Sequence, residues 1–191
     1  MSNMIGAGGA MPPATVKVWD PFVRIFHWSL VACFVIAYAT GDELERVHIA
    51  AGYAIAGLLA ARIGWGFVGP RHARFSNFVR PPREILAYVR NVVILRAPRY
   101  IGHNPAGGAM IVALLIALAG TGATGYMMTT DAYWGSKLIE HVHEFLANLT
   151  VGLVVAHVIG VLIMSFQHRE NLVASMISGR KRAAVSTAEE N

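Results

Sequence analysis

Four apolar stretches dominate this chain of 191 residues and restrict what it can fold into. They run over residues 22–39, 48–67, 106–128 and 139–166. Each is long enough for a helix that crosses a bilayer, which takes roughly 17 to 25 mostly apolar residues. With 55% hydrophobic and 14% charged residues, the chain is also too apolar for an ordinary soluble domain of this size. The sequence therefore predicts an all-α fold, an integral membrane four-helix bundle.

The bundle is expected to form one domain. We predict that residues 16–178 are the transmembrane domain, that residues 1–15, rich in Gly, Ala and Pro, are a flexible lead, and that residues 179–191 are a C-terminal tail. The first charge of the chain is Lys17, and no early apolar run ends in a small-residue cleavage site. We therefore expect no cleavable signal peptide, so that the first stretch stays in the protein as a helix.

The basic residues gather on one side of the predicted bundle. They flank the first span, fill the connection between the second and third spans and follow the fourth: Lys17, Arg24, Arg62, Arg71, Arg74, Arg80, Arg83, Arg90, Arg96, Arg99, Arg169, Arg180, Lys181 and Arg182. Since cytoplasmic loops are rich in Lys and Arg, we expect both termini in the cytoplasm and a multi-pass protein of a bacterial inner (plasma) membrane. Membrane orientation thus explains the net charge of +5, and we expect no nucleic-acid partner.

The connection between the second and third spans contains an amphipathic run. Residues 84–96 follow Pro81 and Pro82 and carry apolar side chains near helical spacing, with arginines between them. Two interpretations stay open: an interfacial helix whose arginines meet anionic lipid headgroups, or a short helix packed on the end of the bundle. Beyond the run, Asn104 and Pro105 predict the start of the third helix, because Asn caps helices and Pro suits their first position.

Two further features each allow two interpretations. Residues 120–125 are all small, which favours either close helix packing or the close approach of a flat cofactor. Arg24 and Arg62 lie near the basic side, where an arginine either extends to the lipid headgroups or pairs with the acid groups of a bound cofactor.

Four histidines lie within the predicted spans: His27, His48, His143 and His157. A histidine in hydrocarbon is costly and usually faces the bundle interior. A single one is more often a packing residue hydrogen-bonded to a neighbouring helix, but here four occur at matching depths. His143 and His157 are 14 residues apart. That spacing puts them within about 40° of one helix face and roughly 20 Å apart along the axis, which suits two cofactors at different depths.

Topology pairs each histidine of the fourth span with one on another span. With the amino terminus inside, His27 comes level with His157, and His48 comes level with His143. Two neutral imidazoles are the axial ligands of a six-coordinate b-type haem. The single cysteine, Cys33, excludes an intrachain disulfide, a cysteine-ligated iron–sulfur cluster and c-type haem attachment. We therefore predict two noncovalent haem b groups, whose iron is ligated by His27 with His157 and by His48 with His143.

The other histidines fit this site less well. His141 is 16 residues from His157, so it points about 160° away from the shared face. The sequence around it also lacks the one-turn spacing of two histidines found in zinc proteases. His72, His103 and His168 lie outside the spans, and we expect their side chains to face solvent or headgroups.

Several short motifs follow one another in an order that is more specific than any of them alone. They are Val18-Trp19-Asp20-Pro21, Arg24, His27-Trp28, His48, Gly52-Tyr53, Arg62, Trp65-Gly66, Gly102-His103-Asn104-Pro105, His143-Glu144, His157, Asn171-Leu172 and Met176. Over most of the chain this order resembles the bacterial cytochrome b561 family, which includes the cytochrome b subunits of nickel–iron hydrogenases. The resemblance implies a four-helix, two-haem bundle that exchanges electrons with a quinone and with a partner across the membrane. It also implies ligand roles for the same four histidines.

These observations predict an electron-transfer subunit of an oxidoreductase system, working in a respiratory chain. The expected partners are membrane lipid, quinone and an external redox protein such as a hydrogenase or a c-type cytochrome. Two alternatives are a stand-alone superoxide:quinone oxidoreductase and a transporter or scaffold without haem. The sequence leaves open whether the chain is itself an enzyme, where a quinone binds, in which direction electrons flow and whether two copies form a homodimer.

Overall fold

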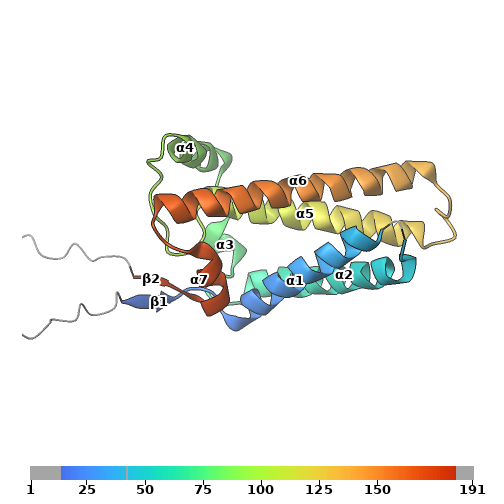
Figure 1. Ribbon diagram of the computed structural model, residues 1–191, viewed down its shortest axis with the longest axis horizontal. Coiled ribbons are helices and arrows are strands. Elements are labelled where there is room, and N and C mark those ends of the chain that lie inside the picture. Colours follow the sequence, from blue (N-terminus) through green and yellow to red (C-terminus); the bar gives the residue numbers. More distant parts are fainter. Residues whose placement is uncertain (1–13, 42, 184–191) are drawn as a thin grey trace, which may run out of the picture.

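The computed structural model of the protein describes residues 14–41 and 43–183 and is mostly helical (Figure 1). Its four long helices are α1 (Pro21–Thr40), α2 (Glu45–Val68), α5 (Pro105–Met128) and α6 (Lys137–Gln167). The shorter elements are α3 (Phe75–Phe78), α4 (Pro82–Val93), α7 (Leu172–Ser178), β1 (Thr15–Lys17) and β2 (Arg180–Arg182). The predicted flexible lead lies outside the described residues except for its last two, and the predicted tail does so beyond Ala183.

The four predicted spans are confirmed as helices, with ends that shift by at most a few residues. All four are long and apolar enough to cross a membrane. Two begin as their sequences indicate. The Asp20 side chain accepts a hydrogen bond from the Val23 amide (3.2 Å) at the start of α1, and Asn104 accepts one from Gly107 (2.7 Å) at the start of α5. In both helices proline follows the capping residue, because its missing N–H costs nothing there.

The long helices form two antiparallel hairpins. In Figure 1, α1 lies beside α2 and α5 beside α6, and the two hairpins join mainly through α2 and α5. A cluster of buried side chains lies at this junction and includes Ala37, Ile55, Leu59 and Leu118. Most other apolar side chains of the four helices point outward, as expected where the surrounding medium is lipid rather than water.

The amphipathic run forms α4. Both interpretations of this run hold in part, because one face of the helix packs on the bundle end and the other is free. Tyr88 is buried against Met164 of α6, and its hydroxyl donates to the Pro98 carbonyl (3.3 Å), so one face packs on the bundle end. On the opposite side Leu86 is 73% and Val93 76% exposed, which leaves an apolar face free. This free face suits the boundary between lipid and water.

A short antiparallel ribbon closes the same end, and the sequence carried no signal for it. β1 pairs with β2, with Val16 opposite Lys181. Close by, the buried Glu170 carboxylate binds Arg99 (2.9 Å) and lies 3.7 Å from the Lys181 amine. Burial alone would raise the pKa of Glu170, but hydrogen bonds from Arg99 and the Arg182 amide, with the charge of Lys181, hold it below its usual value. These ion pairs thus link the segment before α5 and the segment after α6 to strand β2 of the ribbon.

Candidate functional site

The structure brings the four membrane histidines together in the two expected pairs. The ring centroids of His27 (α1) and His157 (α6) are 6.5 Å apart, and those of His48 (α2) and His143 (α6) are 6.0 Å apart. An iron bound to two imidazole nitrogens at about 2 Å each needs ring centroids about 6 Å apart. Both pairs therefore have the separation that a metal between two imidazoles requires.

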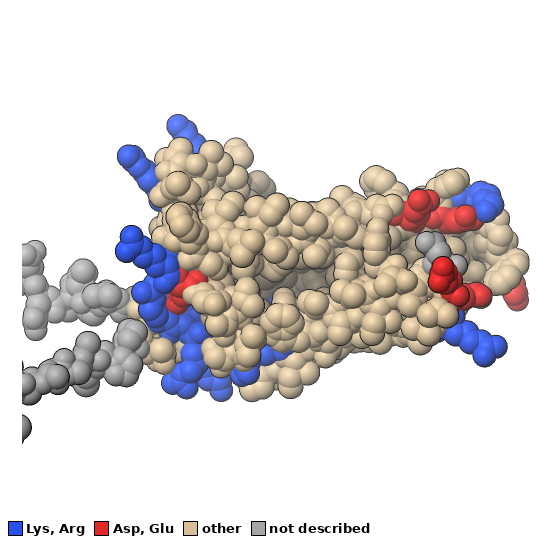
Figure 2. Space-filling view, in the orientation of Figure 1, with Lys and Arg blue, Asp and Glu red and all other residues tan. Residues whose placement is uncertain are grey.

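The two pairs lie at opposite ends of the bundle. His27 and His157 lie toward the end where α1 begins and α6 ends, and His48 and His143 lie toward the other end. Most of the visible Lys and Arg side chains lie at the first end and most of the acidic ones at the second, with an uncharged surface between them (Figure 2). We call these the basic end and the acidic end, and name each histidine pair after its end. Midway between His143 and His157, Thr150 is completely buried, with 0% exposure.

The acidic-end pair is held by backbone carbonyl groups. His48 Nδ1 lies 2.8 Å from the Ala37 carbonyl oxygen, and His143 Nδ1 lies 3.0 Å from that of Thr121. A carbonyl only accepts, so Nδ1 must carry the proton in both rings, which leaves the Nε2 lone pair for a metal. The Thr124 hydroxyl adds a contact of 3.1 Å to His143 Nδ1. Each ring is thus fixed in orientation and tautomer.

The basic-end pair has no such support in the described part of the chain. His27 Nδ1 is buried without a hydrogen-bond partner. The ring instead contacts the edge of Trp28, with centroids 5.0 Å apart. The two ends therefore present the same pair of residues in different surroundings.

Space beside the histidines fits a flat group. Gly52 follows His48 by four residues and Gly160 follows His157 by three, so each lies one turn from a histidine on the same helix face. Both glycines are partly buried, and a β-carbon at either would meet no atom within 4 Å. Room next to both pairs, with histidine nitrogens free to ligate, is what a haem needs, so the residues present fit that group.

The small residues near the end of α5 serve helix packing. A β-carbon at Gly120 would lie 3.1 Å from Leu146 of α6, and one at Gly125 would lie 3.0 Å from the His143 ring. Because Gly125 has no β-carbon, the His143 ring can lie close to α5 at this position. Of the two interpretations of residues 120–125, the structure favours close helix packing.

His103 departs from its expected surroundings. We expected a side chain facing solvent or headgroups, but its ring packs on Trp19 (centroids 4.5 Å apart) and on Phe78 (4.8 Å). Burial and the neighbouring charge of Arg62 lower the pKa of His103 to about 3, so the ring is neutral at physiological pH. The prediction was wrong because the connection between α4 and α5, to which His103 belongs, folds back over the bundle end and brings the ring against Trp19 and Phe78.

The other three histidines take no part in either pair. His141 is exposed, in accord with its predicted orientation away from His157. His72 and His168 are partly buried, and burial lowers the pKa of both. Among residues 14–41 and 43–183, no group of three or more His, Cys, Asp or Glu side chains is arranged to hold a metal ion.

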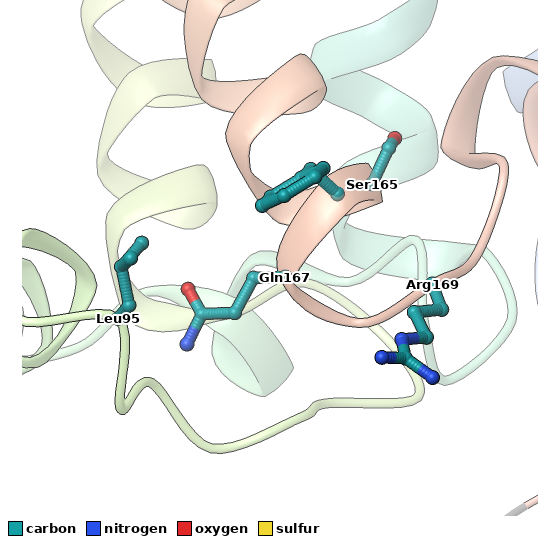
Figure 3. Close-up of a pocket in the computed structure, with 5 residues that line it drawn as sticks. Leu95, Ser165, Gln167 and Arg169 are labelled. Carbon is teal, nitrogen blue, oxygen red and sulfur yellow. The ribbon is translucent and has the colours of Figure 1, made fainter.

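The surface pockets lie away from both pairs. One of about 490 Å³ lies beyond the end of α6, lined by Leu95, Ser165, Phe166, Gln167 and Arg169. The close-up shows Gln167 pointing toward the segment of Leu95 while Arg169 points away from it (Figure 3). Since Gln167 is ten residues beyond His157, it lies about 15 Å farther along the helix axis. A second pocket, of about 360 Å³, lies between α4 and α5. Neither includes a predicted ligand.

Comparison with known proteins extends over most of the chain. The family described as prokaryotic cytochrome b561 matches residues 18–179. Proteins named "Probable Ni/Fe-hydrogenase B-type cytochrome subunit" are 28% identical in Bradyrhizobium diazoefficiens (88% of this chain and 86% of the relative) and 26% identical in Azotobacter vinelandii (86% and 87%). A "Probable Ni/Fe-hydrogenase 1 B-type cytochrome subunit" of Escherichia coli is 23% identical (85% and 88%). No solved structure matches the chain significantly.

Proposed function

Since the chain belongs to the prokaryotic cytochrome b561 family, we propose that it carries two haem b groups and links a membrane quinone to an external redox protein. Haem b and electron transfer come with the family. The number of haems, their ligands, the quinone and the partner are our proposal. The observation that carries it is the presence of two histidine pairs at different depths, with ring centroids 6.5 Å and 6.0 Å apart.

We assign His27 with His157, and His48 with His143, as the residues that would ligate the two haem irons. Bound haem would supply an iron that changes between its ferrous and ferric forms. The four imidazoles would hold the two haems without covalent attachment of the macrocycles, and the helices would surround them with apolar side chains. The two histidine pairs are spaced roughly 20 Å apart along α6, a large part of the hydrocarbon thickness of a bilayer.

We further propose that the basic end faces the cytoplasm of a bacterial inner membrane, by the positive-inside rule. In this orientation the acidic-end pair lies near the external surface. The acidic end carries Glu43, Glu45, Asp131, Glu140 and Glu144. The external redox protein would bind at this acidic end. The names of the relatives support a hydrogenase in that role, and a c-type cytochrome is the second candidate.

A superoxide:quinone oxidoreductase is less well supported by this surface. Superoxide is an anion, and an acidic surface repels anions from the nearest site. One assay distinguishes a superoxide:quinone oxidoreductase from an electron-carrier subunit. A stand-alone enzyme reduces added quinone with superoxide as the only electron donor, whereas a carrier subunit needs its redox partner.

The experiment that tests the proposal is a haem-to-protein ratio. We expect two b-type haems per chain by pyridine haemochromogen analysis of protein purified in detergent, with a reduced-minus-oxidised spectrum typical of six-coordinate haem. A colourless protein from haem-supplied cells would instead favour the transporter or scaffold.

A further inference from the structure

Arg62 of α2 is a buried cation with no anion in direct contact. Its residue exposure is 3%, so it does not extend to the lipid headgroups. One terminal nitrogen donates to the Ala73 carbonyl (3.2 Å), and the other is buried with no hydrogen-bond partner. No carboxylate lies within 4.0 Å of its guanidinium in the described part of the chain, and Asp20, whose negative charge acts on it, lies beyond this distance. The structure thus leaves a guanidinium edge unoccupied inside the protein.

Such a charge is costly unless something compensates it. Burying an unpaired ion is costly even after the protein relaxes, and arginine cannot lose its proton to escape that cost. The guanidinium carbon lies 5.3 Å from the Phe75 ring centroid and 6.0 Å from that of Phe78. Cation–π contacts of this kind are weaker than the cost of burying the charge and offset only part of it. The balance points to an anion that binds here.

The position of Arg62 relates it to the basic-end pair. Phe22 stacks near Trp65, with centroids 4.7 Å apart, and the His48 ring bonds Ala37, so α1 and α2 have a fixed register. In this register Arg62 comes level with residues 24 and 25, about one helical turn from His27 toward the basic end.

Two more buried polar atoms, on α1 and α2 toward the basic end, have no hydrogen-bond partner. They are Arg24 Nε, on the same helix as His27, and Trp65 Nε1, three residues beyond Arg62. Both are donors, as is the free nitrogen of Arg62. A set of buried donors with no acceptor indicates a ligand with negatively charged oxygens.

We propose that Arg62 binds a propionate carboxylate of the haem held by His27 and His157, with Arg24 beside it. This inference rests on the proposed function. A haem carries two propionates on one edge, and a guanidinium binds a carboxylate through two parallel hydrogen bonds. The positive charge neutralises the propionate near the iron. It therefore favours the ferrous form of that haem.

The test replaces the charge and follows each haem separately. In Arg62→Gln we expect an equilibrium redox titration in which one haem shifts at least about tenfold toward the ferric form, which is 59 mV for a one-electron couple, while the other is unchanged. The shifted haem should be the one missing from His157→Leu. Arg62→Lys keeps the charge and should shift less, and it also serves if the Gln variant does not fold. Arg71→Gln, an exposed arginine of the same end, is the matched control.

Three results would overturn the inference. One is two unchanged potentials in an Arg62→Gln protein with full haem content. Another is an equal shift of both haems. The third is the loss of tightly bound phospholipid phosphorus from Arg62→Gln with unchanged potentials, which would identify a lipid phosphate as the anion. A wild-type protein without two haems would instead contradict the proposed function itself, so the two failures are distinguishable.

Discussion

The two histidine pairs differ in what holds them. At the acidic end, His48 and His143 each bond a backbone carbonyl of a neighbouring helix, at 2.8 Å and 3.0 Å. At the basic end, His27 Nδ1 is buried without a partner. Ligand rings fixed by outer hydrogen bonds bind a metal more tightly, because their orientation and tautomer are already set. The acidic-end pair is therefore organised by the polypeptide alone.

The surroundings of the basic-end pair show the opposite balance. Arg62, Arg24 and Trp65 contribute buried donors that the described chain does not satisfy. A ligand with oxygen atoms would satisfy these donors. We infer that the basic-end site reaches its final arrangement only when its ligand binds, and that the contrast between the ends is one between a preformed and a ligand-completed site.

The largest expected effect tests whether the two sites are separate. His143→Leu should remove the acidic-end haem and His157→Leu the basic-end haem, each halving the haem content, because an imidazole ligand is lost from one iron only. Pyridine haemochromogen analysis measures the ratio. His141→Leu, which alters an exposed histidine of α6, is the control and should keep both haems. Full haem in both ligand variants would refute the pairing.

Filling the space beside each pair should have the next largest effect. Leucine at Gly52 or Gly160 would occupy the open volume one turn from a histidine, and we expect each variant to lose more than half of the neighbouring haem. Gly64→Leu and Gly152→Leu are matched controls, because a β-carbon at these exposed glycines of α2 and α6 would also meet no atom within 4 Å. Equal haem content in all four variants would place the macrocycles elsewhere.

Glu170→Gln should destabilise the basic end alone. It leaves the buried Lys181 without its anion, and breaking a buried pair costs about 3 kcal/mol. Thermal loss of the haem spectrum should therefore begin at a lower temperature for the basic-end haem. The pKa of Glu170 is lower in the folded protein than in the unfolded chain, so its contribution is fully present above the unfolded value and is lost as pH falls through the folded value. The wild-type advantage over Glu170→Gln should therefore shrink in acid, and a difference that stays constant as pH falls would contradict this.

The smallest effect concerns the Thr124 hydroxyl. Thr124→Val removes one contact to His143 Nδ1 but keeps the Thr121 carbonyl. We expect about tenfold faster transfer of the acidic-end haem to apomyoglobin, the lower end of what such outer contacts contribute. Thr129→Val, on an exposed residue, is the control. If Thr124→Val instead led to faster transfer of the basic-end haem, the proposed difference between the two sites would be contradicted.

Much of the architecture was predictable because a bilayer imposes simple rules. The spans follow from apolar length, the starts of α1 and α5 from Asp-Pro and Asn-Pro, and the meeting of His27 with His157 from helical spacing. These features depend on local sequence or on the antiparallel order of helices. The role of the four histidines as ligands remains a prediction, although the geometry supports it.

The features that could not be predicted from the sequence depend on backbone groups and on contacts between residues far apart in the chain. A carbonyl of Ala37 or Thr121 has no side-chain signature, so the support of the acidic-end pair was invisible. For Arg62 the sequence favoured headgroups over a cofactor, and its burial could not be predicted. His103 was misjudged because a connecting segment returns over the bundle, and the pairing of β1 with β2 joins residues far apart in the chain.

Thr150 has a consequence for the energetics of the membrane. It lies seven residues from each of His143 and His157, is fully buried, and turns its hydroxyl back to the Leu146 carbonyl (2.8 Å). Proton leakage needs a continuous file of water or polar groups, whereas electrons tunnel through packed apolar atoms. Because the Thr150 hydroxyl is bonded within its own helix, this residue adds no polar step to a proton path between the two pairs, a path that would dissipate redox work across the membrane as heat.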